Sequence, residues 1–139
     1  MEYKILNDLN EDIVAIRYEA FIVGRGVAPD VEIDGRDPEH MHFCIYDEDT
    51  LIAYLRAEDI GGALHVGRVA VKSNLRKSGF GRKLFDWVFE YAKENDFNFI
   101  EVSAVKTAQG FYEKLGFLPE GDYYLETGVP HIYMKKVIA

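Results

Sequence analysis

Residues 75–84 read LRKSGFGRKL, and this stretch joins a predicted strand to a predicted helix. Before it, ALHVGRVAV at 63–71 is rich in β-branched residues, which favour strands. After it, GRKLFDWVFEYAKEN at 81–95 carries apolar residues at helical spacing. Gly79 and Gly81 lack a Cβ, so the main chain between them can approach a ligand closely. Because N–H groups and the positive end of the dipole converge at a helix N-terminus, the stretch predicts a site for an anion such as phosphate.

The side chains around the two glycines add positive charge. Four of the ten residues are basic and none is acidic: Arg76, Lys77, Arg82 and Lys83. Two common phosphate motifs do not fit, because a dinucleotide fingerprint requires glycine at position 84, which is leucine, and the Walker Gly-Lys-Ser/Thr sequence is absent. The remaining pattern, Arg-x-x-Gly-x-Gly, taken alone also fits an ordinary strand–helix connection with a capping glycine.

The charge of the chain is unevenly distributed. Its formal net charge is −8, which argues against general nucleic-acid binding because a phosphate backbone repels an acidic surface. Residues 72–83 nevertheless hold five of the sixteen basic residues and no acid. This contrast indicates one local anion site in an otherwise acidic protein.

Length and composition indicate one globular domain over residues 1–139. Hydrophobic residues make up 48% of the chain, which is enough for a single core. The N-terminus lacks the features of a secretory signal, and no apolar run reaches the roughly 18 residues that a membrane span needs. The lone cysteine, Cys44, lies in an apolar stretch and cannot form an internal disulfide. We therefore expect a cytoplasmic protein, monomeric or homodimeric, without a membrane or nucleic-acid partner.

The rest of the chain alternates strand-like and helix-like segments, as in an α/β fold. Further strands are predicted at 2–6, 41–47, 50–59, 97–105 and 131–138, with a weaker one near 117–125. A helix over 11–23, capped by Asn10, is predicted to bury one apolar stripe: Ile13, Ile16, Ala20 and Val23. A structured loop is expected over 24–38. A short helix from a Thr107 cap to Leu115 is predicted to end at Gly116, with an apolar contact from Phe117.

The order of these segments resembles the GNAT superfamily of acyl-CoA-dependent N-acetyltransferases over nearly the whole chain. Two motifs carry the resemblance: the Arg-x-x-Gly-x-Gly turn and FYEKLGF at 111–117. It implies a single-domain α/β GNAT fold, a mixed twisted β-sheet flanked by α-helices. It also implies that the turn binds the pyrophosphate of coenzyme A and that the strand before it runs beside pantetheine. The implied cofactor-binding residues are Val69, Val71, Arg76, Lys77, Ser78, Gly79, Gly81 and Arg82.

A narrower resemblance is to the ElaA-like branch of that superfamily. Its marks are Arg17 with Phe21, EIDGRD at 32–37, GRVAV at 67–71 and ETGVPHIYM at 126–134. The chain also departs from the branch, which has Glu-Gln where this chain has Gly24-Arg25, and Asn and Gln where it has Ser103 and Val105. Since such positions face the acceptor in these folds, the resemblance does not identify the acceptor.

Acetyl transfer to an amine requires a proton for the departing thiolate. Tyr112 occupies the position at which GNAT enzymes keep that general acid, and a tyrosine, which titrates near about 10, can donate to a thiolate as its charge develops. The alternative is a tyrosine packed between helix and sheet. The resemblance further implies that a main-chain N–H of 69–71 holds the thioester carbonyl, so Val69 and Val71 bind through the backbone while their side chains belong to the core.

The general base and the acceptor site remain open at this point. Five residues are candidates for the base: Glu32, Asp34, His65, Glu126 and His131. Four are candidates for binding the acceptor: Glu32, Asp34, Ser103 and His131. The acidic loop that contains EIDGRD is expected to attract a cationic amine, and the alternative for each residue is a solvated charge or a structural histidine.

The resemblance implies an acetyl-CoA-dependent N-acetyltransferase that acts on a primary amine of a small molecule or protein. The competing interpretation is a noncatalytic acyl-CoA-binding or regulatory module. His40 and His42 share one face of a predicted strand, but no cysteine or carboxylate cluster completes a ligand set, so no metal is expected.

Overall fold

The structure is a computed structural model that describes residues 1–138 of the chain. These residues form seven strands: β1 (Glu2–Leu6), β2 (Met41–Asp47), β3 (Thr50–Ile60), β4 (Ala63–Val71), β5 (Phe99–Val105), β6 (Leu118–Glu126) and β7 (Val129–Val137). They also form four α-helices: α1 (Glu11–Arg17), α2 (Pro29–Glu32), α3 (Phe80–Glu94) and α4 (Gln109–Lys114). The strands are hydrogen-bonded in the order β1-β2-β3-β4-β5-β7-β6. Because β4 and β5 pair in parallel and the pairs β1–β2, β2–β3, β5–β7 and β6–β7 are antiparallel, the sheet is mixed and the predicted fold class is confirmed.

The chain divides into two compact units. The first comprises residues 1–58 and 68–86, and the second comprises residues 59–67 and the chain from 87 onward. Strands β3 and β4 and helix α3 each contribute residues to both units. Each unit is described separately below.

In the first unit, α1 begins where the sequence predicts it. The Asn10 side chain accepts a hydrogen bond from the Ile13 N–H at 2.8 Å, which caps the helix. After Arg17 the chain continues as a π-helix over Tyr18–Val23. The wider π turn shifts the buried face, so Phe21 is buried and Val23 is 68% exposed. The prediction that Val23 lies on the buried stripe is therefore wrong.

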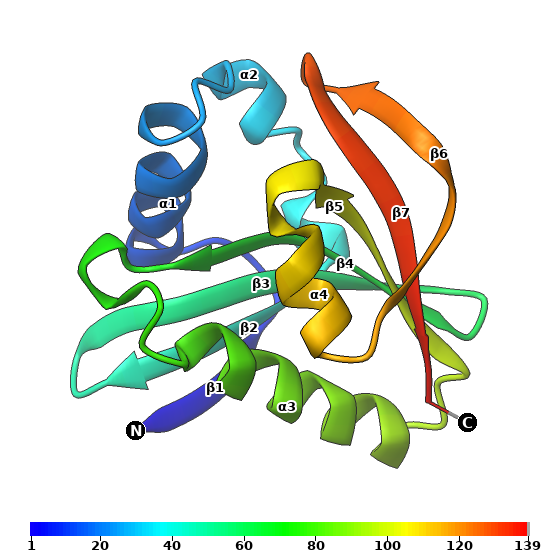
Figure 1. Cartoon of the computed structure of the whole chain (residues 1–139). Coiled ribbons are helices and arrows are strands. Elements are labelled where there is room, and N and C mark those ends of the chain that lie inside the picture. Colours follow the sequence, from blue (N-terminus) through cyan, green and yellow to red (C-terminus); the bar gives the residue numbers. More distant parts are fainter. Residues whose placement is uncertain (139) are drawn as a thin grey trace. The chain divides into compact units, whose positions relative to one another are not determined.

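The core of the first unit joins this helical segment to its strands. Figure 1 shows β1, β2 and β3 as adjacent strands in this part of the chain. The buried cluster contains Ile13, Ile16, Phe21, Cys44, Tyr46, Leu51, Tyr54 and Ala70. Side chains of β2 and β3 are buried at most positions on both faces, as expected for interior strands.

In the second unit, β5, β7 and β6 are neighbours, and β6 and β7 form a hairpin (Figure 1). Strand β5 alternates fully buried Ile100, Val102 and Ala104 with half-buried residues. A 3₁₀ turn (Lys106–Ala108) precedes α4, and the cap residue is Ala108, without a side-chain capping bond. The prediction that Thr107 caps this helix is therefore wrong, because the tighter 3₁₀ turn moves the helix start beyond it.

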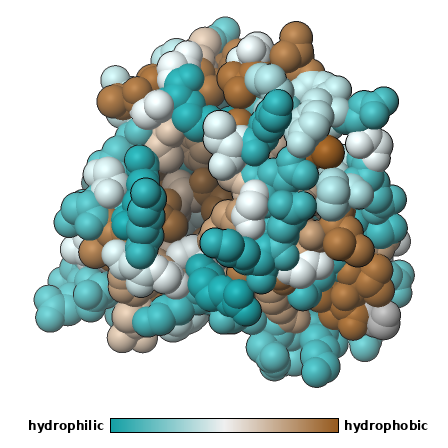
Figure 2. Space-filling model, in the orientation of Figure 1, coloured by the Kyte–Doolittle hydropathy of each residue, from teal (hydrophilic) through white to brown (hydrophobic). Residues whose placement is uncertain are grey.

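The helices of residues 1–138 are too short or too polar to cross a bilayer. On the face drawn in Figure 2, hydrophilic residues are interspersed with hydrophobic ones. Hydrophobic residues also gather in groups on this face, most clearly at the lower right of Figure 2.

Candidate active site

The predicted anion site lies in the first unit, where β4 is followed by α3. One 3₁₀ turn (Ser73–Leu75) leads to a loop in which Lys77 has a φ of 66° and Gly79 a φ of 86°. The Gly79 carbonyl accepts a hydrogen bond from the Lys83 N–H at 3.1 Å, so Gly79 caps the helix. Helix geometry leaves the N–H groups of the first turn to be satisfied from outside the helix. The chain thus forms the glycine-capped helix N-terminus that the sequence predicts.

The surroundings of Gly79 fit an anionic ligand. A Cβ placed on Gly79 would meet no atom within 4 Å, so the main chain is open to an approaching group. Arg76 and Arg82 are exposed on either side. The Arg76 Nε donates to the Val71 carbonyl at 3.3 Å, and the Arg82 Nε lies 3.4 Å from an oxygen of Asp86. Positive charge and accessible main chain are what a pyrophosphate group requires.

The strand before this turn changes character at Arg68. The parallel pairing of β4 with β5 covers Ala63–Val66, and Arg68 then takes a φ of 54°, which is unusual for a residue other than glycine. Val69 and Val71 are half-buried, whereas Ala70 between them is 3% exposed in the core. The prediction that these two valine side chains belong to the core is therefore wrong, because alternate residues of a strand face opposite sides.

Glu32 and Asp34 belong to a cluster of charges in the first unit, in which Glu32 is buried and Asp34 is exposed. The Arg17 Nε donates to the Glu32 Oε1 at 2.7 Å, and the Arg68 Nε lies 2.5 Å from the Glu32 Oε2. The Arg56 Nη2 donates to the Asp34 Oδ2 at 2.7 Å. Glu32 is 1% exposed and both of its oxygens are paired, so its contacts indicate a structural role. The acceptor role of Glu32 and Asp34 stays a prediction that these contacts do not support.

Asp37 completes the same cluster. Its Oδ1 accepts hydrogen bonds from the Arg17 Nη1 at 2.6 Å and the Arg56 Nη1 at 3.2 Å. Burial alone raises the pKa of Asp37, but the hydrogen bonds and charge of the two arginines hold it below its usual range. The pKa of Asp34 is also lowered, chiefly by the hydrogen bond from Arg56. Both carboxylates are therefore ionised at neutral pH.

Tyr112 lies in the second unit, near the end of α4. Gly116 has a φ of 97°, and the Phe117 N–H donates to the Tyr112 carbonyl at 3.1 Å, as in a Schellman motif. The Tyr112 ring packs edge-on against Phe117, with centroids 5.6 Å apart, and against Phe111, at 5.3 Å. The predicted helix end at Gly116 and the apolar contact of Phe117 are confirmed. The ring is held firmly, and its role as general acid stays a prediction.

Ser103 and His131 are far apart in the sequence, but in the second unit both side chains contact Glu126. The Ser103 hydroxyl donates to the Glu126 Oε1 at 3.3 Å, and the His131 Nε2 lies 3.3 Å from the Glu126 Oε2. Tyr124, which belongs to none of the sequence motifs above, lies with its hydroxyl 2.5 Å from the Ser103 Oγ. Tyr124 and Glu126 are two residues apart on β6, so their side chains share one face of the strand. This spacing was the sequence feature from which Tyr124 could have been identified.

The remaining histidines have structural partners. The His65 Nδ1 lies 3.5 Å from a carboxylate oxygen of Glu101. His42 contacts the Tyr54 hydroxyl at 2.5 Å and the Asp37 carbonyl at 2.9 Å. Within residues 1–138, no three His, Cys, Asp or Glu side chains are grouped as metal ligands.

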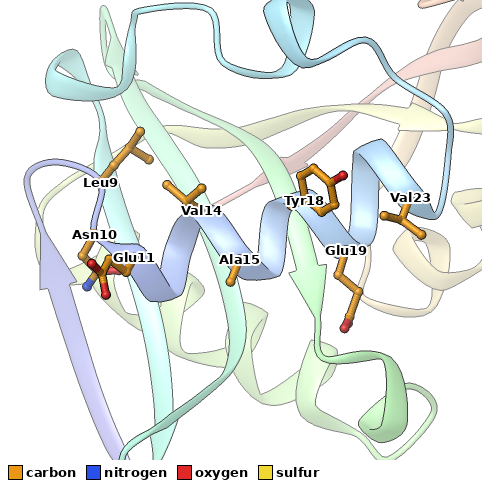
Figure 3. Close-up of a pocket in the computed structure, with 8 residues that line it drawn as sticks. All are labelled: Leu9, Asn10, Glu11, Val14, Ala15, Tyr18, Glu19 and Val23. Atoms are coloured by element: carbon orange, nitrogen blue, oxygen red, sulfur yellow. The ribbon is translucent and has the colours of Figure 1, made fainter.

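An open groove of about 890 Å³ runs along α1 and the π-helical segment. Figure 3 shows its lining, which is Leu9, Asn10, Glu11, Val14, Ala15, Tyr18, Glu19 and Val23. The predicted site residues are not among these. Glu19 nevertheless reaches the segment before the anion site, because its Oε1 accepts a hydrogen bond from the Ser73 N–H at 2.8 Å. This backbone hydrogen bond is the main cause of the lowered pKa of Glu19.

The model of the acetyltransferase (GNAT) domain matches residues 14–138. This chain belongs to the GNAT family. It is 29% identical to Escherichia coli ElaA over 132 residues, covering 91% of this chain and 86% of ElaA. It is 32% identical to a UPF0039 protein of Schizosaccharomyces pombe over 141 residues, covering 96% and 93%.

Solved structures agree with this membership. The crystal structure of E. coli ElaA has a TM-score of 0.86 at 26% identity and covers 98% of this chain and 99% of its own. An acyl-CoA N-acyltransferase from Pseudomonas aeruginosa has a TM-score of 0.85 at 28% identity, covering 97% and 98%. The predicted resemblance to the GNAT superfamily, and to its ElaA-like branch, is confirmed.

Proposed function

We propose that this GNAT protein transfers the acetyl group of acetyl-CoA to a primary amine of a small molecule or protein. The glycine-capped N-terminus of α3 carries the proposal, because it combines an open main chain at Gly79 with basic side chains. The name of the Pseudomonas relative, an acyl-CoA N-acyltransferase, supports the same class of cosubstrate.

In the proposed site, the pyrophosphate of acetyl-CoA binds at residues 76–82. Backbone N–H groups from Ser78 to Gly81 and the side chains of Arg76, Lys77 and Arg82 supply the contacts. A main-chain N–H of Val69 or Val71 polarises the thioester carbonyl. Since hydrogen bonds from fixed donors strengthen as the oxyanion develops, this arrangement lowers the barrier to attack by the amine.

Tyr112 acts as the general acid in this proposal. The amine nitrogen attacks the carbonyl carbon, a C–N bond forms, and the C–S bond breaks. The thiolate takes its proton from the Tyr112 hydroxyl, and the phenolate regains a proton from the acylated nitrogen. The edge-on packing of the ring against Phe111 and Phe117 supports this proposal, because it restricts the orientation of the ring.

The test is release of free coenzyme A thiol from acetyl-CoA across a panel of primary amines. Tyr112→Phe is expected to lower turnover about a hundredfold, at the lower end for a general acid, while affinity for acetyl-CoA and melting temperature stay near wild type. Tyr91→Phe is the matched control, because Tyr91 also packs against a phenylalanine in this unit. A stable Tyr112→Phe variant with wild-type turnover would falsify the catalytic role.

The competing interpretation, a noncatalytic acyl-CoA-binding or regulatory module, makes a different prediction. Such a module binds acetyl-CoA in calorimetry but releases no thiol with any amine of the panel.

We also propose a cytoplasmic location, with which the buried single thiol of Cys44 is compatible. The proposed working form is a monomer or homodimer.

A further inference from the structure

Four polar side chains of the second unit contact one another in a chain across three neighbouring strands. Ser103 is on β5, Tyr124 and Glu126 are on β6, and His131 is on β7. The sheet register explains the grouping, because Val105 and Tyr124 both pair with His131. The order of contacts is Tyr124 to Ser103, Ser103 to Glu126, and Glu126 to His131.

Glu126 is the accessible centre of this chain. Its side chain is 50% exposed, whereas the His131 side chain is 3% exposed. The His131 Nδ1 lies 2.8 Å from the Val129 carbonyl and its Nε2 lies 3.3 Å from Glu126, so both ring nitrogens face oxygen atoms and both donate when the ring is the imidazolium. The Tyr124 ring stacks on His131 at 6.3 Å with an interplanar angle of 26°. One carboxylate oxygen is thus oriented by a buried ring and the other by a hydroxyl, while water or a ligand can still reach the carboxylate.

The sequence around this chain favours a cation. Residues 118–134, which include β6 and most of β7, contain three acids and no lysine or arginine. The acids are Glu120, Asp122 and Glu126. Glu120 is paired with the Lys135 ammonium at 3.6 Å and lies outside the site, whereas Glu126 lies beside Ser103. An aliphatic ammonium at Glu126 would gain a charge-assisted hydrogen bond, and the adjacent Tyr124 ring offers a face for a cation–π contact.

We infer that Ser103, Tyr124 and Glu126 bind the acceptor as a primary aliphatic ammonium ion and that Glu126 removes its proton. This inference rests on the proposed acetyl transfer and names its acceptor class and base. Glu126 is the catalytic residue, and His131 is a positioning residue that orients the carboxylate.

The proton balance of the step is complete. The ammonium loses one proton to the Glu126 carboxylate, which leaves a neutral nitrogen with a lone pair for attack on the thioester. After the C–N bond forms and the C–S bond breaks, the nitrogen loses a second proton, which replaces the one that Tyr112 gave to sulfur. The proton on Glu126 passes to solvent through its exposed side. The products are an N-substituted acetamide, coenzyme A thiol and one released proton.

The experiment compares Glu126→Gln with Glu120→Gln. Both carboxylates lie on β6 with nearly equal exposure, 50% and 52%, so the two changes remove the same charge from similar surroundings. With n-butylamine and 1,4-diaminobutane as acceptors, Glu126→Gln is expected to lower kcat/KM about a hundredfold or more and to leave the Kd of acetyl-CoA unchanged. Glu120→Gln is expected to keep kcat/KM within about threefold of wild type, as for a charge outside the site.

Binding gives a second readout that does not depend on turnover. Amide NMR signals of β6 and β7 are expected to shift with n-butylammonium but not with n-butanol, which has a similar shape and no charge. Glu126→Gln abolishes these shifts. Two variants test His131. His131→Gln keeps a donor toward Glu126, so its KM for the amine is expected to be lower than that of His131→Ala. Both variants are expected to bind acetyl-CoA with equal affinity.

The outcomes separate this inference from the proposed function. If the wild-type protein releases thiol and Glu126→Gln is as active as Glu120→Gln, the inferred acceptor site is overturned and the proposed acetyl transfer stands. Shifts that n-butanol also produces overturn the ammonium class. Absence of thiol release from wild type with every amine overturns the proposed function itself, and the base role of Glu126 with it.

Discussion

Replacing Arg17 by methionine is expected to destabilise the protein strongly. The Arg17 side chain is fully buried and donates to three carboxylate oxygens, two of Glu32 and one of Asp37, as well as to the Glu32 carbonyl. Methionine fills a similar length of the cavity but offers no donor. Both carboxylates then stay buried with one partner fewer. The other oxygen of Asp37 is buried without a hydrogen bond in the described structure, so Arg56 is the partner that Asp37 keeps.

The size of the effect follows from these contacts. Removing one partner of a buried ion pair costs about 3–5 kcal/mol, and since Arg56 and Arg68 still neutralise the carboxylates, we expect about 3 kcal/mol. That is a large fraction of the roughly 5–15 kcal/mol that stabilises a domain, and it corresponds to a fall in Tm of roughly 10 °C.

Urea unfolding at pH 7 measures this loss, with Arg36→Met as the control. Arg36 pairs with Glu58 at 2.7 Å, but its side chain is 48% exposed, so water screens the pair and the urea midpoint should stay near that of wild type. If Arg17→Met lowers the midpoint no more than Arg36→Met does, the buried cluster is not a major source of stability and the reasoning is wrong.

Three further predictions concern the turn, acid stability and the thiol. Gly79→Val is expected to weaken acetyl-CoA binding roughly tenfold in calorimetry, because valine disfavours a φ of 86°, whereas Gly26→Val, at a φ of 69° and equally open, should leave affinity unchanged. Folding lowers the pKa values of Asp34 and Asp37, so the two carboxylates stabilise the protein above the pKa of an unfolded carboxyl group, about 4. This stabilisation is lost as the pH falls below that value. Urea midpoints that rise on acidification would contradict this. Burial raises the pKa of Cys44 to about 12, so a thiol reagent at pH 8 should react slowly with native protein and rapidly in denaturant; fast native reaction would show that the core opens readily.

The central turn could be predicted from the sequence because its signals are local. The β-branched run at 63–71 is the observed β4, and α3 begins at Phe80, one residue before the predicted start. Two glycines and the following periodic apolar residues lie within a few turns of chain, so each influences its neighbours directly. The same holds for the Asn10 cap and for Gly116, whose left-handed backbone ends α4.

Local signals failed where a helix changed type or start. The apolar spacing placed Val23 on the buried stripe, but the π-helical turn brought Phe21 there instead. Thr107 is a good capping residue by its chemistry, yet a 3₁₀ turn precedes α4. In both cases the hydrogen-bond spacing of the turn differs from that of a regular α-helix by only one residue. The helix preferences of individual residues do not distinguish such turns from an α-helix.

The polar clusters were decided by tertiary structure. EIDGRD was visible in the sequence as an acidic loop, but only folding brings Arg17, Arg56 and Arg68 to its carboxylates and forms a network of ion pairs around the buried Glu32. Ser103, Glu126 and His131 were separate candidates, and the register of β5, β7 and β6 joins them with Tyr124 into one chain. A strand's sequence specifies which side chains share a face, but its pairing partner and register depend on contacts made far along the chain, so the neighbours of each carboxylate were fixed only when the sheet formed.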